Sequence, residues 1–139
     1  MKSSRPPLIH LSPGLRWSLA LGWLCFVGVV VYCADRGLVR AFFDFVNSYP
    51  GLDKVGHFCL MGGMGFMFNI AFNLKTWRFL GRRWLVGGTV VLVVVTLEEF
   101  SQRWFPTRTF DLLDLTADYL GIFFFGWLAR RLFGPQEQV

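Results

Sequence analysis

The stretch that decides the fold runs from residue 15 to residue 34 and reads LRWSLALGWLCFVGVVVYCA. It is about as long as the 20 apolar residues that a helix needs to cross the hydrocarbon core of a bilayer. The whole chain has 139 residues, of which 54% are hydrophobic and 18% are aromatic. A soluble domain of this size does not need so much apolar surface, so we expect an integral membrane protein.

Three further segments are expected to be spanning helices: residues 55–74, 84–102 and 111–133. Residues 90–96 would indicate a strand in water, but an isolated strand in lipid leaves its backbone groups unpaired. Residues 38–46 separate apolar from charged side chains on a helix, which predicts a short interfacial helix between the first two spans. The sequence therefore predicts an all-α membrane fold, a four-transmembrane-helix bundle that forms one domain over residues 15–133.

The basic residues indicate how this bundle is oriented. With four spans, residues 1–14, the expected basic loop at 75–83 and residues 134–139 share one side. That side holds Lys2, Arg5, Arg16, Lys75, Arg78, Arg82, Arg83, Arg130 and Arg131, and the other holds Arg36, Arg40, Lys54, Arg103 and Arg108. The positive-inside rule places the richer side, and so both terminal tails, in the cytoplasm. The net charge of +5 is then a feature of orientation, and no nucleic-acid partner is expected.

Ionisable residues gather at the segment ends of the opposite, outward side. Asp53 and His57 are four residues apart and share a helix face, as do Glu98 and Gln102. Asp111, Asp114 and Asp118 form a single stripe, and Asp118 is expected to be the deepest charge and to face the bundle interior. A charge at the centre of a bilayer costs roughly 2.5–3.5 kcal/mol, so this group of residues is the candidate functional site.

The carboxylates of this group outnumber the cations Lys54, Arg103 and Arg108. The excess negative charge would be balanced in one of three ways: by protonation of carboxylates, by a divalent cation, or by a cationic group of a ligand. The candidate ligands of a divalent cation are Glu99, Asp114 and Asp118. Structural roles are the alternative for several residues. Asp53 could cap the second span, Lys54 could reach the interface, and His57 could be an interior histidine with its hydrogen bonds satisfied.

The order and spacing of these motifs resemble the VanZ-like family of small bacterial membrane proteins, named for an accessory teicoplanin-resistance protein. The family pattern runs D-K-x-x-H, then an acidic pair with E-x-x-Q, an aromatic-Pro-x-R turn, and D-x-x-x-D/N-x-x-G. This chain follows it at residues 53–57, 98–102, 105–108 and 114–121. Many relatives carry a histidine where Ser101 stands. The resemblance extends over residues 50–128.

The resemblance implies a multi-pass protein of the bacterial cytoplasmic (inner) membrane that acts on or binds a cell-envelope lipid or headgroup. Membrane lipids, a lipid-linked envelope substrate and further copies of the chain are the expected partners. The residues of this binding interpretation are Asp53, Lys54, Gln102, Arg108, Asp111 and Asp118.

Two alternatives remain open at this point. One is a metal-dependent hydrolase or transferase on a lipid-linked phosphate, with His57, Glu99 and Asp114 as candidate catalytic residues. Carboxylates would hold the metal in that enzyme, and Lys54 and Arg108 would bind the phosphate. The other is a proton-linked transporter, because carboxylates inside a membrane often relay protons and Asp118 lies deepest.

Overall fold

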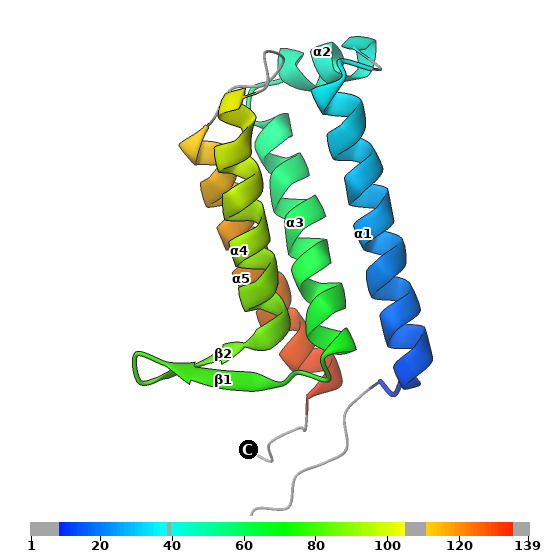
Figure 1. Ribbon diagram of the computed structural model, residues 1–139, viewed down its shortest axis with the longest axis vertical. Coiled ribbons are helices and arrows are strands. Elements are labelled where there is room, and N and C mark those ends of the chain that lie inside the picture. The colour runs from blue at the N-terminus through cyan, green and yellow to red at the C-terminus, as the bar shows by residue number, and fades with distance from the viewer. Residues whose placement is uncertain (1–8, 39, 105–110, 135–139) are drawn as a thin grey trace, which may run out of the picture.

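The computed structural model describes residues 9–38, 40–104 and 111–134 (Figure 1). Its elements within these ranges are α1 (Pro13–Asp35), α2 (Arg40–Ser48), α3 (Leu52–Ala71), β1 (Thr76–Phe79), β2 (Arg82–Leu85), α4 (Val86–Ser101), a 3-10 turn (Gln102–Trp104) and α5 (Leu112–Phe133). The four long helices run side by side, α2 lies across one end, and the β-hairpin projects from the other. The predicted helical fold and the short helix after the first span are therefore confirmed.

Two of the described helices are long and apolar enough to cross a membrane, α1 over Pro13–Ala34 and α5. Helix α4 has 16 residues and spans about 24 Å at a rise of 1.5 Å per residue, which is shorter than the roughly 30 Å hydrocarbon core. Helix α3 has 20 residues but carries Asp53, Lys54 and His57 in its first two turns. Length and composition of the described helices thus identify two candidate spans, whereas the sequence predicts four.

Helix α3 lies at the centre of the bundle and packs most closely on α5. A Cβ atom at Gly62 would lie 2.9 Å from the backbone of Gly121, and one at Gly121 would collide with the carbonyl oxygen of Phe58. Close approach of two helices requires small residues at such crossing points. Gly62 lies at such a crossing point, whereas Gly56 has nothing within 4 Å of its added Cβ atom.

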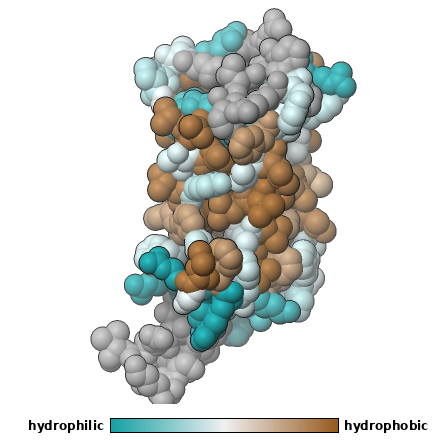
Figure 2. Space-filling model, turned by 60° about the vertical axis from the view of Figure 1, so that its left-hand side comes forward, coloured by the Kyte–Doolittle hydropathy of each residue, from teal (hydrophilic) through white to brown (hydrophobic). Residues whose placement is uncertain are grey.

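The buried apolar core is formed by side chains of all four long helices: Val27, Met61, Met64, Val91, Val95 and Ile122. Met61 and Met64 are both buried in this core. The outer surface is apolar as well, with Val29, Leu97 and Leu120 each about 60% exposed. On the face that it displays, Figure 2 shows hydrophobic side chains across the middle of the molecule and hydrophilic side chains toward both ends.

Residues 76–85 form a β-hairpin, which corrects the expected basic loop at 75–83. Strands β1 and β2 pair antiparallel, with Phe79 opposite Arg82. The two turn residues, Leu80 and Gly81, have φ angles of +50° and +74°. Positive φ at both central positions defines a type I′ turn, whose twist matches that of paired strands. Trp84 belongs to β2, so α4 begins at Val86 and not near Trp84 as expected.

Candidate functional site

The candidate site lies at the end of the bundle where α3 begins, α4 ends and α5 begins. Gly51 adopts φ +83° at the N-cap of α3, so the chain turns sharply and places Asp53 and Lys54 in the first helical turn. Asp111 is the N-cap of α5, and its Oδ1 accepts the backbone N–H of Leu113 at 2.8 Å. These two helix starts bring residues almost sixty positions apart to the same place.

Lys54 joins α3 to the start of α5 through three ion pairs. Its Nζ atom lies 2.8 Å from Asp53 Oδ2, 2.7 Å from Asp111 Oδ2 and 2.5 Å from Asp114 Oδ1. A lysine ammonium has three N–H donors, so each donor can serve one carboxylate. Because all three donors of Lys54 have carboxylate partners, the geometry of this side chain does not support the interpretation that it binds a ligand phosphate.

These contacts shift the pKa values of three groups at the helix ends. The hydrogen bond from Lys54 lowers the pKa of Asp53 and of Asp111 below the ordinary value of 3.8. Partial burial opposes the charged form of Lys54, but the hydrogen bonds to Asp111, Asp114 and Asp53 outweigh it and raise the pKa of Lys54 above its ordinary value. All three groups are therefore charged at neutral pH.

His57 lies one turn deeper on α3, between two carboxylates of α5. Its Nδ1 atom is 3.1 Å from Asp118 Oδ1, and its Nε2 atom is 3.8 Å from Asp114 Oδ2. The Asp118 side chain is only 1% exposed, which confirms that this residue turns into the bundle. Because Asp114 also contacts Lys54, the histidine is connected to the ion pairs at the helix ends.

Glu99 connects the end of α4 to the same group. Its carboxylate is fully buried, and it accepts the backbone N–H of Asp111 at 2.9 Å and the side-chain amide of Gln102 at 3.0 Å. Gln102 also donates to Glu98 at 3.2 Å. Glu99 therefore holds the start of α5 against the end of α4, and two donors satisfy a carboxylate that burial would otherwise disfavour.

The structure brings almost all the predicted site residues into one connected set of hydrogen bonds and ion pairs. We call this set the polar cluster: Asp53, Lys54, His57, Glu98, Glu99, Gln102, Asp111, Asp114 and Asp118. Arg108, expected to bind a phosphate, lies outside the described residues. The suggestion that Asp53 caps its helix is wrong, because Gly51 occupies the N-cap position of α3 and no side-chain hydrogen bond caps this helix start.

The candidate metal ligands Glu99, Asp114 and Asp118 each have different partners in the structure. Glu99 accepts from Gln102 and the Asp111 backbone, Asp114 accepts from Lys54, and Asp118 pairs with His57. Among the described residues, no group of three or more His, Cys, Asp or Glu side chains is arranged to hold a metal ion. The divalent-cation hypothesis thus stays a prediction that the observed geometry does not favour.

Asn69 is a buried polar residue that is not among the site residues predicted from the sequence. It lies near the end of α3, it is 1% exposed, and its Oδ1 accepts the backbone N–H of Gly88 at 2.6 Å. An amide side chain within the apolar run of residues 58–72 was the available signal, since such residues often hydrogen-bond between packed helices.

No family model, curated protein or solved structure matches this chain. The resemblance to the VanZ-like family therefore remains a hypothesis based on the motifs quoted above.

Proposed function

We propose that this chain is a four-span, VanZ-like membrane protein that binds a cell-envelope lipid or headgroup at its polar cluster. The observation that carries the proposal is the convergence of three separate motifs on one end of an otherwise apolar bundle. Residues 53–57, 98–102 and 111–118 come from three helices and form one network. A function that uses these residues together explains why polar groups are retained beside and within apolar segments.

Two features support a membrane location. Large apolar side chains are exposed on the outside of the helices, including Val29, Leu97 and Leu120. Figure 2 shows hydrophobic surface between hydrophilic ends on the face that it displays. The hairpin end of the bundle is basic, and no carboxylate lies there among the described residues. Its basic residues are Arg16, Lys75, Arg78, Arg82, Arg83, Arg130 and Arg131. The positive-inside rule assigns this end to the cytoplasm, so the polar cluster faces the outer leaflet.

The charge balance of the polar cluster favours a ligand with a cationic group. Its described side chains include six carboxylates (Asp53, Glu98, Glu99, Asp111, Asp114 and Asp118) and one lysine. Lys54 is already paired with three of these carboxylates. An amine on an envelope lipid or its headgroup would find acceptors there, whereas a phosphate would meet net repulsion.

The topology can be tested by cysteine labelling. Cys25, Cys33 and Cys59 are first replaced by serine, and Ser48→Cys or Leu80→Cys is then introduced at one or the other end of the bundle. We expect a membrane-impermeant maleimide to label Ser48→Cys in intact bacteria and Leu80→Cys only after lysis. The reverse pattern would overturn the orientation, and recovery of the protein in the soluble fraction would overturn the membrane location.

Ligand binding can be tested with a matched pair of lipids and a matched pair of variants. Phosphatidylethanolamine is compared with its N-acetylated form, which has the same chains but no ammonium group. Asp111→Asn removes a charge from the polar cluster and keeps an N-cap residue for α5, while Asp44→Asn removes an exposed carboxylate in α2. We expect Asp111→Asn alone to weaken retention of phosphatidylethanolamine, and equal retention of both lipids would contradict an amine-binding site.

A cellular test addresses the family resemblance directly. Expression in a teicoplanin-susceptible bacterium is expected to raise the inhibitory concentration of teicoplanin. Asp118→Asn should reduce this effect and Asp44→Asn should preserve it, provided that membrane levels are equal. An unchanged inhibitory concentration for the wild-type chain would count against the VanZ-like assignment without affecting the lipid-binding result.

The pairing of His57 with the buried carboxylate of Asp118 favours proton-linked transport as a second candidate function. Asp118 is 1% exposed and is paired with a titratable side chain, as in intramembrane proton relays. This candidate predicts pH-dependent flux in liposomes that Asp118→Asn abolishes. Absence of flux in wild-type liposomes, with the protein inserted, would exclude it.

A further inference from the structure

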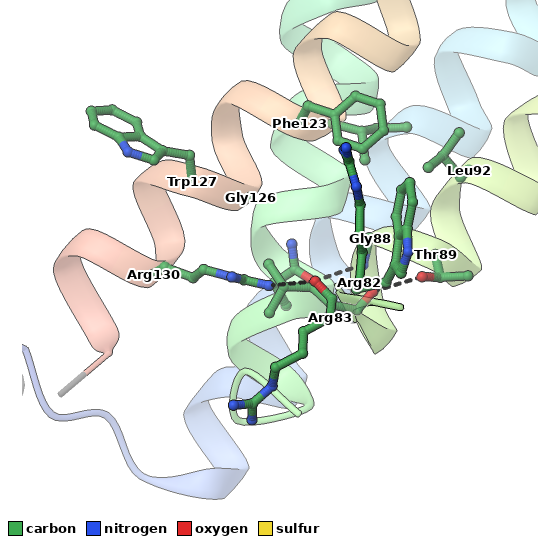
Figure 3. Close-up of a pocket in the computed structure, with 13 residues that line it drawn as sticks. Arg82, Arg83, Gly88, Thr89, Leu92, Phe123, Gly126, Trp127 and Arg130 are labelled. Carbon is green, nitrogen blue, oxygen red and sulfur yellow. Dashed lines mark hydrogen bonds between the residues drawn. The ribbon is translucent and has the colours of Figure 1, made fainter. Parts of the chain in front are cut away.

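A cavity of about 290 Å³ lies at the end of the bundle opposite the polar cluster. Its walls are formed by the hairpin, the start of α4, the second half of α5 and the end of α3 (Figure 3). None of the polar cluster residues lines it. The cavity is therefore a second and separate place where this chain could hold a ligand.

Asn69 lines this cavity with a hydrogen-bond donor that the described chain leaves unused. Its Oδ1 accepts from Gly88, but its Nδ2 is buried without a partner among the described residues. Space beside this nitrogen is kept free by a glycine, since a Cβ atom at Gly126 would lie 3.4 Å from Nδ2. Leaving a buried donor without an acceptor costs free energy. A ligand that supplies an acceptor to this nitrogen would remove that cost.

Three arginines, Arg82, Arg83 and Arg130, surround the cavity with positive charge. Arg83 contacts Thr76, and Arg130 donates to the backbone oxygen of Arg83. Within the described residues, the Arg82 side chain makes no hydrogen bond or ion pair. Figure 3 shows this side chain extending along the cavity toward Phe123. The described carboxylates lie toward the other end of the bundle, so within the described chain these cations are not neutralised by protein groups.

The rest of the lining is apolar and aromatic, with Leu92, Ile122, Phe123 and Trp127 among its residues. Phe123 and Trp127 are each about half exposed, so the apolar wall continues onto the outer surface of α5. A ligand that fills this cavity must combine an anionic, hydrogen-bond-accepting group with an apolar part. Guanidinium groups match the oxygens of phosphate in charge and geometry.

We propose that this cavity binds a phosphate group carried on an apolar chain. Arg82 binds the phosphate oxygens, the Asn69 amide donates to one of them, and the apolar chain lies against Ile122 and Phe123. The cavity holds a headgroup and the first carbons of its chains, and the remainder follows the exposed surface of α5. This proposal does not depend on the function proposed for the polar cluster or on the orientation of the chain in a membrane.

The test uses three probes that separate the two parts of the ligand. Purified, delipidated full-length chain in a neutral detergent is titrated with phosphatidic acid, with diacylglycerol and with inorganic phosphate, and bound ligand is counted by native mass spectrometry. We expect saturable binding of one phosphatidic acid and much weaker binding of the other two. Equal binding of diacylglycerol would overturn phosphate recognition, and equally tight binding of inorganic phosphate would assign the cavity to the free ion and overturn the amphiphile.

Two variants and one matched control connect binding to this cavity. Arg82→Gln removes an exposed cation whose side chain makes no hydrogen bond or ion pair with the described residues, and we expect affinity for phosphatidic acid to fall about tenfold. Gly126→Ala covers the Asn69 nitrogen with a methyl group at ordinary contact distance and should weaken binding without loss of helix content. Arg78→Gln removes an exposed cation of β1 that does not line the cavity and should bind normally. Equal losses for Arg82→Gln and Arg78→Gln would indicate general surface attraction and overturn the site.

Discussion

The Nδ1 atom of His57 lies 3.1 Å from the Oδ1 atom of Asp118, a carboxylate whose side chain is 1% exposed. This contact joins α3 to α5 below the ion pairs of Lys54. Replacing one member of a buried pair leaves the other without compensation, whereas replacing both with apolar groups is much less harmful. The pair is thus a structural link whose energetic coupling can be measured.

We predict that His57→Leu lowers the free energy of unfolding by about 3 kcal/mol, because Asp118 then remains buried without a partner. Adding Asp118→Leu to the same chain should recover at least about 1 kcal/mol of that loss. Reversible unfolding of the detergent-solubilised protein, followed by circular dichroism, measures both effects. Additive losses in the double variant would show that the two side chains are not coupled.

Acid should weaken the link between Lys54 and the helix ends. The pKa values of Asp53 and Asp111 are lowered below 3.8 in the folded chain. A carboxylate with a lowered pKa stabilises folding above its unfolded-state pKa, and this contribution is lost as the pH falls through the folded-state pKa. We therefore predict that the free energy of unfolding decreases from about pH 4 downward.

Lys54→Met supplies the comparison for this acid response. Without the ammonium group, Asp53 and Asp111 have lost the cation that lowers their pKa values, so their protonation no longer breaks ion pairs. The variant should be less stable than wild type at neutral pH and should lose less stability on acidification. Lys75→Met, at the hairpin end, should follow the wild-type curve. Parallel acid responses in wild type and Lys54→Met would show that the ion pairs contribute nothing.

Two glycines of the helical bundle should respond to alanine in opposite directions. Gly121→Ala places a methyl group against the carbonyl oxygen of Phe58, where α3 and α5 meet, and overpacking of this kind costs about 1–3 kcal/mol. Gly56→Ala meets nothing within 4 Å and should gain up to about 1 kcal/mol from its higher helix propensity. Thermal unfolding of the two variants measures the difference. Equal stability of the two variants would contradict the close packing of these helices.

The sequence predicts the helical fold well where apolar runs are long. Helix α5 begins and ends within one residue of the segment expected at 111–133, because Asp111 supplies a cap and Gly134 follows the last apolar turn. The i and i+4 spacing of Asp53 and His57 also indicated correctly that these side chains share a face. Periodicity within one helix is a local property, so it can be read directly from the chain.

Contacts between helices join residues far apart in the sequence, so the sequence was less informative about these contacts than about the helices themselves. The ion pairs of Lys54 depend on how α3 and α5 cross, which no spacing within either helix determines. The Asn69 Nδ2 atom, which has no partner among the described residues, depends likewise on where α4 and α5 pack around it. The role of Arg108 remains a prediction from the aromatic-Pro-x-R motif, since this residue lies outside the described ranges.

The residues of the hairpin turn explain why the sequence did not predict the hairpin. Substitutions at these residues also provide a test of the turn. Type I′ turns favour Asn-Gly, and this chain has Leu80-Gly81 instead. A leucine at φ +50° carries a steric penalty of about 1–2 kcal/mol, and this side chain is 84% exposed. Leu80→Asn should relieve most of that penalty and slow amide hydrogen exchange in β1 and β2 about fivefold. Gly81→Ala, at φ +74°, should accelerate the same exchange because alanine is strained there. If both variants exchange at the wild-type rate, the amides of the hairpin do not exchange through opening of this turn.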